Sequence, residues 1–182
     1  IAPQMSRAIC RSTPGSENRI SSSTVRLGTR WLTFVCSKKP FWIRPWGRLQ
    51  IAREIAFLRR LAGIEGIPRL LGRLDADGLV TEFIPGKALF LCRKRVPREH
   101  YVLQLREILA AVHAHGIVHN DLRGRENVHV ADLSDRVYLL DWAGAVRLPP
   151  GSIRHRLLFD RWKSVDEAAV LKWKMILIPE GL

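Results

Sequence analysis

Apolar residues recur at helical spacing in two long stretches of the chain. Between residues 49 and 61 they return every three or four positions, with arginines on the opposite side, and the pattern closes near Gly63. A second stripe covers residues 98–115 and ends at Gly116, where a helix C-cap is expected. Residues 166–177 predict a final helix, with acidic residues near its start and lysines toward its end.

A hairpin is predicted directly after the first of these helices. The segments 66–74 and 79–84 are both rich in apolar residues, and they flank the turn-forming sequence Asp-Ala-Asp-Gly at 75–78. The second run stops at Pro85, which cannot donate a ladder hydrogen bond.

Three further short runs have the composition of strands. Residues 31–36 are aromatic and β-branched, and residues 127–130 and 137–140 are separated by a polar segment that would turn the chain. Residues 1–29, which are rich in Ser, Thr, Arg and Gly, show no sustained period, so we expect an irregular or disordered segment there.

The composition describes a chain that can bury a core. It has 182 residues, of which 47% are hydrophobic and 26% charged. The longest apolar runs, such as 89–92 and 175–178, are far shorter than the roughly 20 residues of a membrane-spanning helix. The three cysteines, Cys10, Cys36 and Cys92, are widely spaced. Their spacing predicts neither a disulfide framework nor a zinc ribbon, and it suits a reducing compartment.

Positive charge is concentrated in the first part of the chain. The formal net charge is +13, and residues 1–73 hold 14 Lys or Arg against 3 Asp or Glu. Such a field attracts nucleic acid, nucleotides or an anionic membrane, and it equally describes a solvated basic face. Because the sequence begins with Ile1 and not Met, we expect a fragment or a misassigned start.

Two carboxylates and one amide form the most informative pattern. Asp121 lies in a loop after the helix predicted at 98–115, Asn127 begins a strand, and Asp141 ends the strand that would pair with it. If these strands form a hairpin, Asn127 and Asp141 lie at the same end, close to Asp121. A carboxylate and an amide are hard oxygen ligands for magnesium that is shared with nucleotide phosphates. The other carboxylate is then available to accept the proton of a hydroxyl nucleophile.

The order helix, H-x-D-L, N, strand, turn, strand, D-x-x-G resembles the catalytic core of the protein-kinase superfamily. It is most similar to the small atypical bacterial kinases of the RIO-like and lipopolysaccharide-kinase type. The resemblance implies a reduced two-lobed α+β fold, with a small N-terminal lobe at 30–84 and a short helical lobe carrying a catalytic hairpin at 85–182. It also implies transfer of the γ-phosphate of ATP, with Mg²⁺, to a hydroxyl acceptor on a protein Ser or Thr, a sugar or a lipid headgroup.

The resemblance assigns roles by matched position. Asp121 is the expected catalytic base, Asn127 and Asp141 are the expected magnesium ligands, and Arg123 stands where many kinases place a lysine that touches the transferred phosphate. His119 is expected to brace the loop through its ring nitrogens, and no other histidine shows the spacing of a zinc site.

The resemblance also assigns nucleotide contacts in the first half of the chain. Glu54 would pair with a phosphate-binding lysine, either Lys38 or Lys39, although its arginine neighbours favour a solvated helix position equally well. Glu82 and Ile84 mark the segment whose backbone groups would face adenine.

Several features depart from the kinase pattern. Six positions separate Asp121 from Asn127, one more than the usual pattern allows, so we expect the loop to bulge at Gly124. Trp142 and Ala143 replace the Phe and Gly of D-F-G, and no glycine-rich phosphate loop is visible. A pseudokinase that acts as a binding scaffold is therefore an alternative.

A second alternative is a basic nucleic-acid-binding protein. Trp42 and Trp46 alternate with basic residues, a combination that grips single strands or rests at a membrane interface. No recognisable nucleic-acid module accompanies them. We expect a cytoplasmic protein, and peripheral contact with the inner face of an anionic membrane stays open.

Overall fold

The computed structural model describes residues 20–27, 30–37, 42, 44–92 and 97–178. The chain divides into two compact units. The first contains the residues up to Arg59 together with Pro68–Phe83, and the second contains Arg60–Ile67 and Ile84 onward. Each unit is described separately below.

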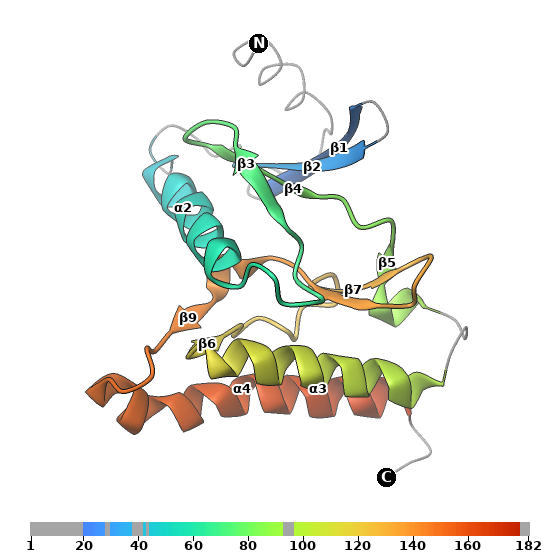
Figure 1. Cartoon of the computed structure of the whole chain (residues 1–182), viewed down its shortest axis with the longest axis vertical. Coiled ribbons are helices and arrows are strands. Elements are labelled where there is room, and N and C mark those ends of the chain that lie inside the picture. Colours follow the sequence, from blue (N-terminus) through green and yellow to red (C-terminus); the bar gives the residue numbers. More distant parts are fainter. Residues whose placement is uncertain (1–19, 28–29, 38–41, 43, 93–96, 179–182) are drawn as a thin grey trace. The chain divides into compact units, whose positions relative to one another are not determined.

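The first unit contains a four-stranded antiparallel sheet (Figure 1). Its strands are β1 (Ile20–Leu27), β2 (Arg30–Ser37), β3 (Leu70–Arg73) and β4 (Gly78–Glu82), in the order β1-β2-β4-β3. The strand predicted at 31–36 is confirmed as β2. The irregular segment predicted over 1–29 is wrong for residues 20–27, because antiparallel pairing with β2 supplies backbone hydrogen bonds that the local pattern does not reveal. Residues 1–19 lie outside the described residues.

The predicted hairpin is confirmed as β3 and β4. Its turn is closed by the Asp77 amide, which donates to Asp75 Oδ1 at 2.7 Å, and by the Leu74 amide, which donates to the Gly78 carbonyl at 3.0 Å. The first strand is shorter than predicted because residues 66–69 form a loop that contains Gly66 at φ 85° and Pro68.

Helix α2 (Arg44–Arg60) matches the first predicted helix. The predicted apolar positions Ile51, Ile55 and Leu58 are buried. The helix begins five residues earlier than predicted, since Pro45 lies in its first turn, where a missing N–H costs nothing.

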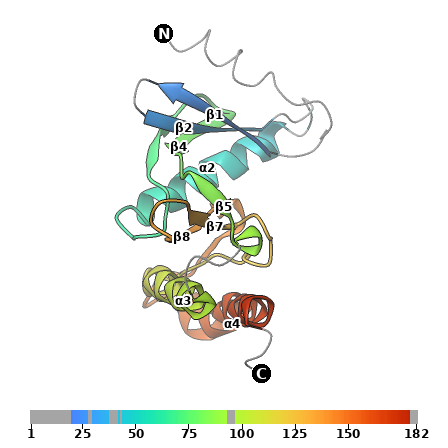
Figure 2. The same ribbon diagram turned by 90° about the vertical axis from the view of Figure 1, so that its right-hand side faces the viewer.

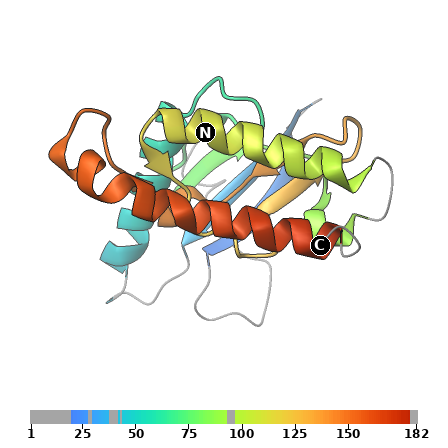
Figure 3. The same ribbon diagram turned by 90° about the horizontal axis from the view of Figure 1, so that it is seen from below.

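The second unit is built on two long helices, α3 (Arg98–Ala114) and α4 (Ile153–Leu177). They pack side by side and run in opposite directions (Figures 2 and 3). Helix α3 agrees with the prediction, and Gly116 has the expected positive φ of 65°. Helix α4 begins 13 residues before the predicted start, capped by the Ser152 hydroxyl, which accepts from the His155 amide at 3.1 Å. In its first turns Phe159 is the only hydrophobic residue with a buried side chain, so the apolar period is weak.

Short strands complete the second unit. Strands β5 (Gly86–Ala88), β7 (Val128–Ala131) and β8 (Val137–Leu139) form one sheet, and β6 (Ile117–Val118) pairs with β9 (Val146–Arg147). Two 3₁₀ turns, η1 (Leu89–Leu91) and η2 (Trp142–Gly144), follow β5 and β8. The β7–β8 hairpin predicted from the sequence is confirmed, and it holds the candidate site.

No helix within the described ranges is both long enough and apolar enough to cross a membrane.

Candidate active site

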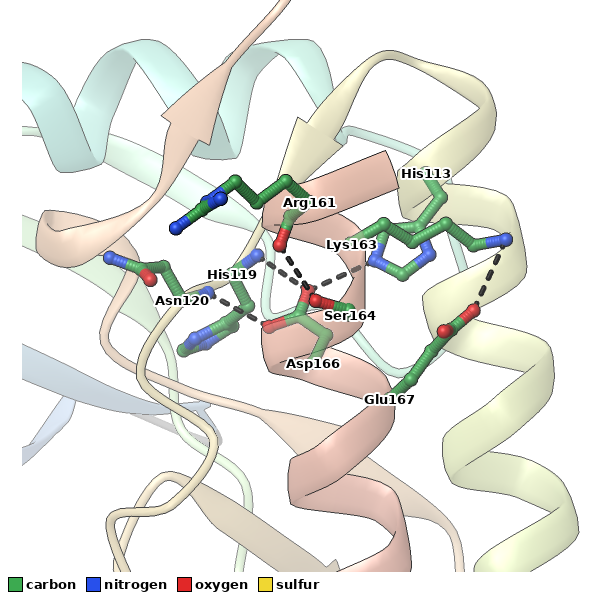
Figure 4. Close-up of polar contacts among 8 residues, drawn as sticks. All are labelled: His113, His119, Asn120, Arg161, Lys163, Ser164, Asp166 and Glu167. Atoms are coloured by element: carbon green, nitrogen blue, oxygen red, sulfur yellow. Dashed lines mark hydrogen bonds and ion pairs between the residues drawn. The ribbon is translucent and has the colours of Figure 1, made fainter. Parts of the chain in front are cut away.

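Asp166, in the middle of α4, holds the start of the loop that carries Asp121 (Figure 4). Its side chain is fully buried. Oδ2 accepts from the His119 amide and Oδ1 from the Asn120 amide, both at 2.9 Å. His113 Nε2, on α3, lies 2.9 Å from Oδ2 and completes the group. These donors compensate the loss of water around the buried carboxylate.

The position of Asp166 was not predicted. The sequence placed it near the start of the last helix, as a residue that favours helix initiation, and that interpretation is wrong because α4 starts at Ile153. Its partners lie 46 to 53 residues away along the chain, so no local pattern reports them.

The ring of His119 braces the loop that carries Asp121, as the sequence analysis expected. Its ring is fully buried and lies 4.4 Å from the Trp142 ring, centroid to centroid. Nε2 donates to the Leu140 carbonyl at 3.0 Å, while Nδ1 has no hydrogen-bond partner in the described part of the chain. Burial lowers the pKa of His119, and the nearby charge of Asp166 opposes this effect without reversing it. The imidazole is therefore neutral near pH 7.

The amide of Asn127 holds Asp121. Asn127 Nδ2 donates to the Asp121 backbone carbonyl at 2.7 Å and to its carboxylate Oδ2 at 3.0 Å. The extra residue of this loop is accommodated in a turn at the expected place, closed by the Asn127 amide donating to the Gly124 carbonyl at 3.3 Å. A Cβ at Gly124 would lie 2.9 Å from Asn127 Nδ2, so only glycine lets the amide approach without displacement.

Two residues of α4 fix the next part of the loop. Trp173 Nε1 donates to the Leu122 carbonyl at 2.9 Å, and Lys172 Nζ donates to the Arg123 carbonyl at 3.1 Å. The indole is buried and the lysine is exposed. The sequence analysis missed both residues. These contacts link α4 to the two positions that follow Asp121.

The β7–β8 hairpin brings Asp141 to the same end as Asn127. The Leu140 amide donates to the Asn127 carbonyl at 2.9 Å, one step beyond the paired residues Val128 and Leu139. Asp141 has φ 60°, and its Oδ1 accepts from the Ala143 amide at 3.3 Å. This contact caps the turn in which the indole of Trp142 is buried.

The turn that follows Asp141 reaches Asp121. A Cβ built on Gly144 would lie 3.6 Å from Asp121 Cβ, and Asn120 Nδ2 is 3.5 Å from the Gly144 carbonyl. The structure therefore brings Asp121, Asn127 and the turn that begins at Asp141 to one end of the hairpin.

The oxygen atoms at this end suit magnesium. Because Asn127 uses Nδ2 to bind Asp121, its Oδ1 is available as a ligand, and so is Oδ2 of Asp141, which has no hydrogen-bond partner within the described residues. Magnesium commonly takes one or two protein oxygens and completes its octahedron with water and phosphate oxygens. The oxygen donors present thus suit a magnesium ion.

Cationic side chains lie on the same loop. Arg123 and Arg125 are exposed, and the Arg125 guanidinium lies 5.7 Å from the centroid of the Phe90 ring. Neither arginine forms an ion pair with an acidic residue in the described ranges. They are thus available to an anionic group near Asp121.

The residues assigned to nucleotide binding in the first half of the chain differ in burial and in their contacts. Glu54 is 6% exposed, so the solvated position considered for it is wrong. Lys38 and Lys39 lie outside the described residues. Glu82 accepts from Arg69 Nε at 3.1 Å, and Ile84 is half-buried. The nucleotide contacts assigned to these residues stay predictions.

No protein-family model and no curated protein sequence matches the chain. Among solved structures, it is similar to a Rio2 kinase from Chaetomium thermophilum in complex with ADP, Mg²⁺ and phosphoaspartate, with a TM-score of 0.66 and 13% sequence identity. The similarity covers 94% of this chain and 58% of that kinase. The chain therefore has a mixed α+β, reduced protein-kinase-like fold, as predicted. The bacterial and lipopolysaccharide-kinase subtype stays a prediction.

Proposed function

We propose that the protein is a magnesium-dependent phosphotransferase that moves the γ-phosphate of ATP to a hydroxyl acceptor. The observation that carries this proposal is the Asn127 side-chain amide bound to the Asp121 carboxylate at 3.0 Å, at the end of the hairpin that also delivers Asp141. The protein-kinase-like fold supports the same interpretation. In the solved Rio2 complex, the related fold is recorded with ADP and Mg²⁺.

Asp121 acts as the base in this proposal. As the acceptor oxygen bonds to the γ-phosphorus, the bond from that phosphorus to the β–γ bridging oxygen breaks and ADP leaves. The acceptor proton passes to the Asp121 carboxylate, which the Asn127 amide holds in place. Asp121 is exposed, so an acceptor can reach it.

The remaining side chains manage charge and position. Arg123 supplies positive charge next to the transferred phosphoryl group, where negative charge is spread over its oxygens. Asn127 Oδ1 and Asp141 Oδ2 would hold magnesium, which neutralises phosphate charge when it is bound. The buried Asp166 carboxylate and the neutral His119 ring keep the loop from shifting.

Release of ADP from ATP tests this proposal. We expect turnover that requires Mg²⁺ and an added hydroxyl acceptor, and that falls by about 100-fold or more in Asp141→Asn, because the variant removes a charged ligand of the metal. Asp132→Asn is a suitable control, since that carboxylate lies at the far end of the β7–β8 hairpin. Binding of Mg-ATP without turnover in the wild type would instead establish the scaffold alternative and contradict the proposal.

A further inference from the structure

Large apolar side chains are exposed along one face of α2 and at Trp42, two residues before its start. Trp42 is 70% exposed, Trp46 59% and Leu49 50%. Trp46 and Leu49 are three residues apart on α2 and therefore lie on the same side of the helix, whereas Trp42 lies two residues before the helix begins. Trp46 and Leu49 therefore form an exposed apolar stripe on α2.

The charged side chains that α2 exposes are all arginines. The single acidic residue of the helix, Glu54, is buried. The five arginines are all exposed: Arg44, Arg48, Arg53, Arg59 and Arg60. Arg48 Nε donates to Asp77 Oδ1 at 2.9 Å, and the Arg48 side chain is still 49% exposed. At 3.6 residues per turn, Arg53 and Arg60 share the side of α2 that carries Trp46 and Leu49, so this side combines apolar and positively charged groups.

Helix α4 provides a useful contrast. It also exposes large apolar residues, with Ile153 at 75% and Leu157 at 74%. However, Asp160 and Glu167 are exposed on the same helix and reduce its positive charge. Only α2 combines exposed tryptophan with an exposed charge of one sign among the described helices.

We propose that α2 docks the protein on an anionic phospholipid surface. The helix lies in the plane of the membrane interface, with Trp46 and Leu49 at the boundary between headgroups and acyl chains. Arg53 and Arg60, on the same side of the helix, lie at the level of the lipid phosphates, where each basic side chain adds attraction. Tryptophan suits this depth because its ring is apolar and its indole N–H is polar.

The leucine distinguishes a membrane from a nucleic acid as the partner. Both partners are anionic, and both accept tryptophan against an apolar or stacking surface. Leu49 has no flat ring on which a base can stack, but transfer of its side chain from water to the acyl region is favourable. This proposal does not depend on the phosphotransferase activity.

Co-sedimentation of the full chain with lipid vesicles tests the proposal. We expect binding to phosphatidylcholine vesicles that contain about 30% phosphatidylglycerol, and at least about fivefold weaker binding to phosphatidylcholine alone. Trp46→Ser combined with Leu49→Ser should weaken binding about tenfold or more, because both apolar contacts are lost. Leu133→Ser is the matched control, since Leu133 is 95% exposed on the β7–β8 turn and should leave binding unchanged.

The charge requirement is tested without altering the apolar stripe. Arg53→Gln should weaken binding to the anionic vesicles about fivefold, whereas Arg154→Gln on α4 should not. Raising the salt concentration should release wild-type protein. Equal binding to both vesicle types, no vesicle binding, or unchanged binding by the double variant would overturn the proposal. So would binding to a single-stranded oligonucleotide that the double variant loses while vesicles fail to bind.

Discussion

Asp166 supports the candidate site although its own side chain is buried and cannot reach a substrate in solvent. Its carboxylate is fully buried and receives three contacts that join α3, α4 and the loop. Asp166→Ala leaves two loop amides and His113 Nε2 without an acceptor, so we expect the free energy of unfolding to fall by about 3 kcal/mol or more. Urea denaturation measures this change.

Asp160→Ala is the control for Asp166→Ala. Asp160 lies on the same helix but is exposed, so its removal should change the free energy of unfolding by less than about 0.5 kcal/mol. Similar losses for the two variants would show that the buried contacts carry no special stability.

His119 makes stability depend on pH. Burial lowers the pKa of its ring below the ordinary value of 6.5, so below that pH the unfolded chain binds a proton that the folded chain does not. The stability contributed by the neutral ring is present above pH 6.5 and is lost as the pH falls below it. The change in the free energy of unfolding that is due to His119 is at most about 1.4 kcal/mol per pH unit.

Denaturation between about pH 7.5 and 5.5 measures this dependence. His119→Gln, which keeps an N–H donor for the Leu140 carbonyl, should flatten the curve. Part of the slope should remain, because burial also lowers the pKa of His129. A variant with the same slope as the wild type would contradict the role given to His119.

At the scale of elements, α4 holds the loop that carries Asp121 through Trp173 and Lys172. The loop has one more residue than the usual kinase spacing, and these side chains bind the carbonyls of its two positions after Asp121. Trp173→Phe keeps an aromatic ring but removes the donor to Leu122. We expect kcat to fall about tenfold with little change in KM for ATP, since the base loses its position while the nucleotide contacts remain.

Trp162→Phe is the matched control for Trp173→Phe. Trp162 lies on the same helix but packs against the cluster of Val118, Leu148 and Phe159. It should leave kcat unchanged. Lys172→Met should lower kcat in the same direction as Trp173→Phe, and a change confined to KM in either variant would argue against positioning of the base.

At the scale of the whole molecule, the sequence predicts best where contacts are local. The periodicity of residues 98–115 and the Asp-Gly turn at 75–78 determine their own structures, so α3 and the β3–β4 hairpin are confirmed. The relation between Asn127 and Asp141 also follows from the sequence, because a short hairpin brings its two ends together.

The sequence predicts poorly where a structure depends on distant partners. Strand β1 exists because β2 pairs with it, and the first half of α4 has too few buried apolar residues to show a helical period. Asp166, Lys172 and Trp173 bind loop positions 46 to 51 residues away. The placement of Asn127 and Asp141 at one end of a hairpin was therefore predictable, whereas most of the contacts that hold the loop were not.

Transfer of labelled γ-phosphate from ATP to a panel of hydroxyl acceptors tests the central claim most directly. Wild-type protein with Mg²⁺ should label at least one acceptor, and Asp121→Asn should lower the rate by about 100-fold or more while its melting temperature stays within a few degrees of the wild type. This result would place the base at Asp121. Equal transfer by wild type and Asp121→Asn, or no transfer by wild type to any protein, sugar or lipid acceptor, would contradict the account.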